Sequence, residues 1–336
     1  MKYSQSFRLP MRILIELSGE QPALARAEAL AALEASGRPA RFLIGEERTL
    51  AVDSDVDPVW LARRLGLAKL VDELLAWGTV DAVVSAAKSL DFGDRTFRVR
   101  VNSFKGCHSK EELERRIGDQ IGGAVDLRSP QEEVRLIEGE QHYLCRVRAA
   151  VDRRAFEKRK VTERSFFFPI SLHPRLARVL VNLSRVPEGG TLLDPFCGTG
   201  GVLLEAGLVG ARVVGGDIRE DMVAGSRDVL SQFGLAADLH VGDVADIAGR
   251  VRGVDAIAMD PPYGRATTTK GESLTSLYRR GFEAAAEALK PGGYLSAVLP
   301  DTVARPEVEG LEFVESYHLR VHRSLTRTFV VTRRAS

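Results

Sequence analysis

The second half of the chain alternates short apolar segments with amphipathic ones, as in a sheet whose strands are joined by helices. Five strands with helices between them are predicted at 191–193, 212–216, 238–240, 256–259 and 294–299. Two further strands, at 311–322 and 326–332, are separated by only a few residues, and so short a connection requires antiparallel pairing. The pattern predicts an α/β fold with a Rossmann-like sheet that ends in an antiparallel hairpin.

The first half has a different order of elements. A strand at 11–17, a helix at 21–36, two strands within 41–52, a helix at 58–67 and a strand at 70–75 follow one another. This βαββαβ order is typical of a ferredoxin-like unit, which would end near Gly78. A second α+β unit is predicted from a helix at 80–90, a strand at 96–101, a helix that opens at Ser109 with Glu112 as its capping box, and strands at 124–127 and 132–151, the latter folded over at 138–140.

These patterns divide the chain into four parts. We predict α+β domains at 1–78 and 79–152, a basic linker at 153–170 and the α/β domain at 171–336. With 336 residues, of which 44% are hydrophobic, the chain is long enough for two or three globular domains. No apolar run is long enough to span a membrane and the N-terminus lacks a signal-peptide pattern, so a cytoplasmic location is expected.

Cysteine usage gives no sign of a metal centre. Cys107, Cys145 and Cys197 lie far apart and form no C-x-x-C pair, which argues against a disulfide framework and against a zinc site. We therefore expect no metal. The sequence leaves the oligomeric state open.

A glycine-rich turn, DPFCGTGG at 194–201, follows the first strand of the α/β half. Gly198 and Gly200 permit tight turning and the close approach of a ligand. The spacing differs from the dinucleotide pattern G-x-G-x-x-G, and no Lys-Ser or Lys-Thr follows as in a P-loop. A pyrophosphate cradle is therefore disfavoured, whereas Asp194 suits a ligand that carries the ammonium group of an amino acid.

Acidic residues end the next two strands. Asp217 follows the strand at 212–216, where a carboxylate can bind both hydroxyls of a ribose. Asp243 follows the strand at 238–240, within reach of an adenine amino group. Each acid could instead cap the following helix. Because ligands of open α/β sheets bind at the carboxyl ends of the strands, the ordered set predicts one nucleoside pocket.

The tetrapeptide DPPY at 260–263 follows the fourth strand of this half. Its prolines make a rigid turn that presents carbonyl oxygens as acceptors only. The Asp260 carboxylate adds an acceptor, and the Tyr263 ring offers a face on which a planar base can stack. These features suit an exocyclic NH2 group held for methyl transfer. The structural alternative is a proline turn that closes a buried strand.

The ordered motifs resemble those of class I S-adenosylmethionine-dependent methyltransferases that act on exocyclic amines. Three further segments, RSFFFPISLHPRLAR at 164–178, VNL at 181–183 and HRSLTR at 322–327, are similar to the archaeal tRNA (guanine-10, N2) methyltransferases that carry a THUMP domain. The resemblance covers the chain from about Phe156 to the C-terminus and implies S-adenosylmethionine as cofactor and tRNA as partner. It also implies a THUMP domain at 79–152.

The resemblance assigns roles to individual positions. It implies a reaction centre of Asp260, Pro261 and Tyr263. It implies cofactor contacts from Asp194, Phe196, Gly198, Gly200, Asp217, Ile218, Asp243 and Val244. The implied reaction adds one or two methyl groups to N2 of a guanosine in tRNA, at position 10. The run 166–168 of three phenylalanines would line the cofactor or base pocket, with packing as the alternative for at least one ring.

Two alternatives remain beside this hypothesis. DPPY also occurs in amino methyltransferases acting on DNA, so the target could be DNA, rRNA or another tRNA position. The chain could also be a non-catalytic RNA-binding protein, although the four intact acids argue against it.

The net charge of +1 gives little support for a polyanionic partner, but the charge is unevenly distributed. Between Arg146 and Arg164, eight basic residues face three acidic ones, which predicts a phosphate-binding strip or, alternatively, a solvated linker. The RNA-binding candidates are Lys105, Lys110, Arg128, Arg153, Arg154, Lys158, Arg159 and Lys160.

Overall fold

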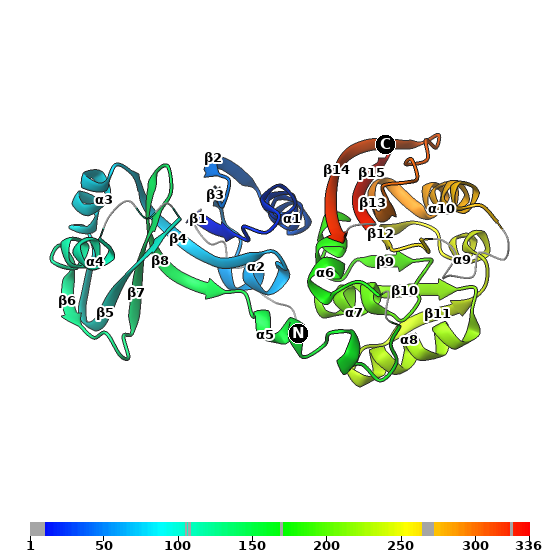
Figure 1. Cartoon of the computed structure of the whole chain (residues 1–336), viewed down its shortest axis with the longest axis horizontal. Coiled ribbons are helices and arrows are strands. Elements are labelled where there is room, and N and C mark those ends of the chain that lie inside the picture. Colours follow the sequence, from blue (N-terminus) through cyan, green and yellow to red (C-terminus); the bar gives the residue numbers. More distant parts are fainter. Residues whose placement is uncertain (1–10, 105, 107–108, 169–170, 264–271, 323–324) are drawn as a thin grey trace. The chain divides into compact units, whose positions relative to one another are not determined.

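The computed structural model describes residues 11–336 except 105, 107–108, 169–170, 264–271 and 323–324 (Figure 1). The chain forms two compact units. Unit 1 contains Arg38–Ala62, Ala68–Val151 and the described residues up to Pro22, and unit 2 contains Ala23–Gly37, Arg63–Leu67 and Asp152–Ser336. Unit 2 therefore includes a helix from the first quarter of the chain. The four parts of the chain drawn from the sequence remain predictions.

Unit 1 is built on one eight-stranded sheet in the order β2-β3-β1-β4-β8-β7-β5-β6. Its strands are β1 (Met11–Leu17), β2 (Ala40–Glu46), β3 (Thr49–Ser54), β4 (Ala68–Gly78), β5 (Asp91–Ser103), β6 (Gly122–Val125), β7 (Glu132–Glu138) and β8 (His142–Ala150). Strand β4 pairs antiparallel with β1 and also with β8. The two α+β units predicted from the sequence thus share a single sheet, because β4 extends beyond the predicted 70–75 at both ends.

Two helices of unit 1, α3 (Val80–Ala87) and α4 (Lys110–Gly118), pack on β4, β5 and β8. Their buried faces, including Val83 and Ile117, join a core with Phe97 of β5 and Leu136 of β7. The predicted start of α4 is confirmed, since the Ser109 hydroxyl accepts from the backbone of Glu112 at 3.4 Å.

Unit 2 contains a seven-stranded sheet in the order β11-β10-β9-β12-β13-β15-β14. Its strands are β9 (Thr191–Asp194), β10 (Arg212–Asp217), β11 (Ala237–Val241), β12 (Val254–Met259), β13 (Leu289–Pro300), β14 (Leu311–His322) and β15 (Leu325–Arg334). The first five are parallel, and β15 runs antiparallel between β13 and β14, so the predicted Rossmann-like sheet with a terminal hairpin is confirmed. From β9 the order runs outward to β11 and then returns to β12. A ligand crevice opens at such a reversal.

Helices cover both faces of this sheet (Figure 1). α6 (Pro174–Leu183), α7 (Gly201–Leu208) and α8 (Glu220–Gln232) pack together, and α9 (Val244–Arg250) packs with α10 (Leu274–Ala288). The remaining helices of the chain are α1 (Pro22–Ala35), α2 (Pro58–Arg64), α5 (Arg153–Glu157) and the 3-10 turn η1 (Val161–Glu163). Apolar side chains such as Ile257, Tyr278 and Leu295 fill the core between β12, β13 and α10.

A buried polar cluster holds α1 against α6. The Glu28 carboxylate is fully buried and accepts from the backbone of Gly66 and Leu67, both at 2.7 Å, and from the Asn182 amide at 2.8 Å. The Asn182 side-chain oxygen accepts from Nε of Arg64 at 3.0 Å. Burial raises the pKa of Glu28, although each of these hydrogen bonds opposes the shift. Helix α1 therefore belongs to the packing of unit 2.

A buried ion cluster fixes α7 to its surroundings. Glu205 of α7 is fully buried and binds Nε of Arg159 at 2.6 Å and Nη2 of Arg178 at 2.8 Å. Arg178 also donates to the carbonyl of Arg63 at 2.8 Å. One carboxylate thus connects α7 with α6 and with the segment after α5.

Candidate active site

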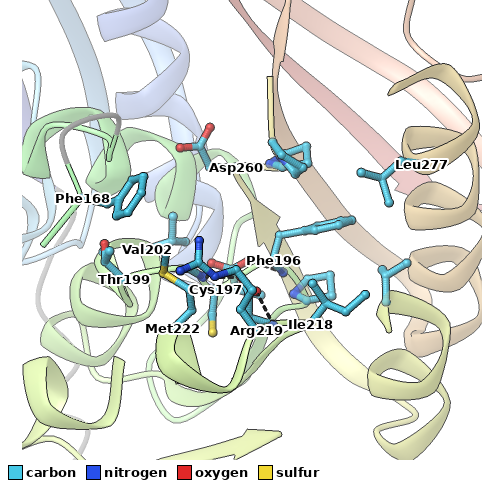
Figure 2. Close-up of a pocket in the computed structure, with 18 of the residues that line it drawn as sticks. Phe168, Phe196, Cys197, Thr199, Val202, Ile218, Arg219, Met222, Asp260 and Leu277 are labelled. Atoms are coloured by element: carbon cyan, nitrogen blue, oxygen red, sulfur yellow. Dashed lines mark hydrogen bonds between the residues drawn. The ribbon is translucent and has the colours of Figure 1, made fainter. Parts of the chain in front are cut away.

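A cavity of about 390 Å³ opens at the carboxyl ends of β9, β10 and β12. Its lining comes from the loops after these strands and from α10. Figure 2 shows Phe168 and Thr199 on one side of the cavity and Leu277 of α10 on the other. Ten of the predicted site residues line it: Asp194, Phe196, Gly198, Asp217, Ile218, Asp243, Val244, Asp260, Pro261 and Tyr263. The sequence prediction that these motifs meet at the carboxyl ends of the strands is therefore confirmed, since their residues line one cavity.

The glycine turn after β9 needs its glycines for different reasons. Gly198 has φ +48°, a conformation that other residues rarely adopt, and it lines the cavity. Gly200, the N-cap of α7, has φ +76°, and a Cβ there would lie 2.7 Å from the Ser226 hydroxyl. Its missing side chain makes room for α8. Gly201 lines the cavity and Gly200 does not, while the predicted contact of Gly200 with the cofactor remains a prediction.

Asp194 places a buried carboxylate beside the glycine turn. It is 1% exposed, and its Oδ1 accepts from the backbone of Phe196 at 3.1 Å. Burial raises its pKa well above the ordinary value, and the nearby charges of Asp260 and Asp217 raise it further. A cationic ligand group would favour the ionised form of these acids, so Asp194, Asp217 and Asp260 together suit a cationic group better than an anionic one.

Asp217 ends β10 and holds the glycine turn. Its two oxygens accept from the backbone of Gly198 at 3.1 Å and of Arg219 at 2.9 Å. Burial raises the pKa of Asp217, and these two hydrogen bonds oppose the shift. Each carboxylate oxygen keeps a lone pair for a ligand, since an ionised carboxylate can accept about four hydrogen bonds.

The Asp243 carboxylate already accepts hydrogen bonds from other residues of the protein. It caps α9 by accepting from Ala245 at 3.1 Å, and Arg280 of α10 donates to both of its oxygens, at 2.6 and 3.2 Å. Arg280 also binds Glu272 at 2.7 Å. The capping alternative considered for the strand-end acids is therefore realised at Asp243. Its contact with adenine remains a prediction. Sequence reasoning missed Arg280 because it lies 37 residues further along the chain.

The DPPY turn is held from two sides. The Tyr263 hydroxyl donates to Oδ1 of Asp260, and the Tyr278 hydroxyl donates to the Pro262 carbonyl at 2.7 Å. The guanidinium of Arg327 lies 5.5 Å from the centre of the Tyr263 ring. Burial raises the pKa of Asp260 to about 7, and the charge of Arg327 opposes this shift. Arg327 and Tyr278 were not predicted as site residues, although Arg327 ends the resembling segment at 322–327.

The three consecutive phenylalanines have three different surroundings. Phe168 lines the cavity, as expected for one ring of the run. Phe166 packs on α8, where a Cβ on Gly225 would lie 2.1 Å from its ring. Phe167 is 51% exposed. The packing alternative therefore applies to Phe166.

One of the RNA-binding candidates is not available to phosphates. Arg159 is buried, and its Nε and Nη2 donate to the two oxygens of the Glu205 carboxylate, which corrects the prediction because the side chain is enclosed and its charge is already neutralised. Within the same basic strip, Arg146 and Arg148 pair with Glu132 and Glu73. The exposed candidates, which remain predictions, are Lys110, Arg128, Arg153, Arg154, Lys158 and Lys160. Lys105 lies outside the described residues.

Neither a membrane-spanning helix nor a metal-binding cluster occurs among the described residues. Across residues 11–336, leaving aside the undescribed positions, no helix has the length and apolar character needed to cross a membrane. The described side chains also include no group of three or more His, Cys, Asp or Glu residues that could hold a metal ion.

Comparison with known proteins identifies similar sequences that cover up to 96% of the chain. A family model described as "RMKL-like, methyltransferase domain" matches residues 162–328. The tRNA (guanine(10)-N2)-dimethyltransferase of Methanothermobacter thermautotrophicus is 35% identical over 338 residues, covering 96% of this chain and 100% of that protein. The enzyme of the same name from Pyrococcus abyssi is also 35% identical, covering 94% of this chain and 98% of that protein. Among solved structures, TrmN from Thermus thermophilus has the same fold, with a TM-score of 0.54 and 24% identity over 96% of this chain and 99% of that chain.

Proposed function

Because this chain belongs to the tRNA (guanine(10)-N2)-dimethyltransferase family, we propose that it transfers methyl groups from S-adenosylmethionine to the exocyclic N2 amine of a guanosine in tRNA. The observation that carries the proposal is one cavity in which Asp260 of the DPPY turn faces the glycine turn and the acids of β9 and β10. The proposed target is guanosine 10, with one or two methyl groups added. A tRNA substrate also agrees with the expected cytoplasmic location.

The cavity suits the proposed cofactor in size and chemistry. Its volume of about 390 Å³ lies within the range of small-molecule sites. Phe196, Ile218 and Val244 give it an apolar wall against which a planar adenine can pack. Asp217 would bind the ribose hydroxyls, and Asp194 would bind the ammonium group. The cofactor supplies an activated methyl group, while the protein supplies position and charge.

Asp260 would act on the guanine amine. The amine nitrogen is a weak nucleophile because its lone pair is delocalised into the ring. A carboxylate that accepts its hydrogens orients the nitrogen and stabilises the positive charge that develops as it is methylated. Tyr263 donates to Oδ1, which leaves Oδ2 open for the amine or for its proton. Tyr263 would also stack on the base, and the Pro261 carbonyl would accept the second hydrogen.

The proposal is tested by identifying the product. Unmodified tRNA is incubated with the full-length protein and S-adenosylmethionine, digested to nucleosides and fragments, and mapped by mass spectrometry. We expect N2-methyl- and N2,N2-dimethylguanosine at position 10. Product on adenine or cytosine would place the chain among other amino methyltransferases. Binding of tRNA without any methylated product would support the non-catalytic alternative.

Replacing Asp217 by asparagine should weaken cofactor binding. The substitution keeps the shape of the side chain but removes the negative charge that strengthens its hydrogen bonds to hydroxyl groups. We therefore expect the affinity for the cofactor to fall by about tenfold to a hundredfold. Isothermal titration with S-adenosylhomocysteine measures the change. Asp228→Asn is a matched control, because Asp228 is exposed on α8 and outside the cavity lining. Equal affinities for Asp217→Asn and wild type would contradict the ribose assignment.

The activity should depend on pH through Asp260. Its folded-state pKa is raised to about 7, so the protein holds this proton until the pH approaches 7, and only the ionised form can stabilise the positive charge on the amine nitrogen or take up its proton. We expect kcat/KM to rise about tenfold per pH unit below pH 7 and to level off above it. A flat profile between about pH 5.5 and 8.5 would show that Asp260 has an ordinary pKa or no role in the rate.

A further inference from the structure

Arg327 carries a buried charge at the start of β15, close to the DPPY turn. Its side chain is only 8% exposed. Its backbone is fixed from both sides, since it lies opposite Pro300 of β13 and Leu319 of β14. An arginine is rarely buried to this degree without a negative charge in its surroundings. The position of Arg327 therefore depends on an acidic group of the site.

The Tyr263 ring connects this charge with the cavity. The guanidinium of Arg327 lies 5.5 Å from the centre of the ring. Tyr263 lines the cavity, whereas Arg327 is not among the lining residues. The hydroxyl of the same ring donates to Oδ1 of Asp260. Arg327 therefore acts on a ligand only indirectly, through the ring and through the effect of its charge on Asp260.

The titratable groups that surround Asp260 come from four elements. They are Tyr263 of the same turn, Tyr278 of α10, Asp194 at the end of β9, and Arg327 of β15. Both tyrosines are hydrogen-bond donors in their neutral form, and the charge of Asp194 repels a second negative charge. Burial raises the pKa of Asp260 to about 7, and among the described residues the charge that opposes this shift is that of Arg327.

The two arginines that line the cavity have other partners. Arg219 binds Asp221, and Arg280 binds Asp243 at 2.6 Å. Neither is therefore available as the cation for the buried carboxylate of the DPPY turn. Among the described residues, this leaves Arg327.

We propose that Arg327 is a positioning residue for methyl transfer, whose buried charge beside the Tyr263 ring serves as the counter-charge of the Asp260 carboxylate. The inference rests on the proposed function, in which this carboxylate stabilises the positive charge that develops on the guanine amine. A buried carboxylate stays ionised at little cost only when a cation lies near it. Arg327 supplies this cation from behind the cavity lining, so that no basic side chain has to occupy the space of the base.

The dependence of the rate on pH tests the proposal. We measure kcat/KM for the methylation of tRNA by the full-length protein between about pH 5.5 and 9.5. Arg327→Met removes the charge and so favours the protonated form of Asp260. The midpoint of the profile should therefore move upward by about one pH unit, with a loss of about tenfold at pH 6 and a much smaller loss on the plateau. A loss of equal size at every pH would overturn the proposal, because a purely structural role does not move the midpoint.

Two further substitutions separate charge from hydrogen bonding and cover the case in which Arg327→Met does not fold. Arg327→Lys keeps the charge and should keep the wild-type midpoint within about 0.3 pH unit. Arg327→Gln keeps N–H donors without the charge and should move the midpoint as methionine does. Arg320→Met is the matched control, because Arg320 is exposed on β14 of the same hairpin and outside the cavity lining. A wild-type midpoint in Arg327→Gln would overturn the role of the charge.

A double-mutant cycle shows whether Arg327 acts through Asp260. In the Asp260→Asn background there is no carboxylate for the charge to stabilise. Adding Arg327→Met to it should lower the rate at pH 6 by less than about twofold, against about tenfold in the wild-type background. Equal losses in the two backgrounds would contradict the proposal, since Arg327 would then act independently of Asp260.

The same experiments separate this inference from the proposed function. Isothermal titration should show that Arg327→Met binds S-adenosylhomocysteine within about threefold of wild type, so that the change in rate does not come from a collapsed site. If the wild-type protein methylates N2 of guanosine and the variants keep its midpoint, only the role of Arg327 fails. If the wild-type protein forms no N2-methylguanosine, the proposed function fails, and the role of Arg327 fails with it.

Discussion

Replacing Asp260 by asparagine is expected to lower the rate of methyl transfer by about 10²- to 10³-fold, the usual effect of losing one group that stabilises charge in a transition state. Asparagine has nearly the same shape as aspartate and can still accept a hydrogen bond. It cannot neutralise the charge that develops on the amine nitrogen or take up its proton. Single-turnover assays with labelled cofactor and saturating tRNA measure the rate directly.

Binding measurements distinguish this effect from a collapse of the site. Asp260→Asn should bind S-adenosylhomocysteine, which carries no sulfonium charge, within about threefold of wild type, a change of less than one kcal/mol. Asp238→Asn is the matched control, because Asp238 lies on β11, outside the cavity lining. A variant that retained more than about a tenth of the wild-type rate would contradict the proposed role of Asp260.

Replacing Glu205 by alanine is expected to destabilise unit 2 by about 3–5 kcal/mol, the usual cost of removing one partner from a buried ion pair. The carboxylate has no exposed surface and is bound by Arg159 and Arg178, which are 7% and 3% exposed. Without it, two desolvated guanidinium groups remain with no anion between them. Urea unfolding followed by far-UV circular dichroism gives the change in the free energy of unfolding.

The comparison variants for Glu205 test the electrostatic explanation. Glu205→Gln keeps the hydrogen-bond acceptor and loses the charge, so it should fall between alanine and wild type. Glu283→Ala, on the exposed face of α10, should change stability by less than about 0.5 kcal/mol. A loss below about 1 kcal/mol for Glu205→Ala would mean that the cluster contributes no more than a surface ion pair.

Most of the α/β half could be predicted because its signals are local. The apolar runs that form β9, β10 and β12 are bounded by turns. Glycine and acidic residues follow each run directly, so the strand and its site residue are read from one short segment. Parallel strands of one sheet have their carboxyl ends at the same edge, which is why motifs far apart in sequence could be assigned to one cavity.

The predictions from sequence fail for residues whose interaction partners are distant in sequence. Arg159 lies in a basic segment and was assigned to phosphate contact, but its partner is Glu205, 46 residues away. Nothing in the local sequence distinguishes Glu205 from other acidic residues on a helix that follows a glycine turn. A charge count over neighbouring residues cannot show such a pair, because the pairing depends on how α7 packs against the segment after α5.

Sequence by itself therefore determined the order of the strands and helices, the position of the glycine turn, and the four acidic residues at strand ends, of which Asp260 is the last. These follow from the period of apolar residues and from backbone preferences, which act over a few residues. The tertiary structure alone decided which charges are exposed and which are neutralised inside: Arg159 on Glu205, Arg280 on Asp243, and Arg327 beside the Tyr263 ring. The physical reason is that burial and pairing are properties of packed surfaces, and a surface forms only when segments distant in sequence come together.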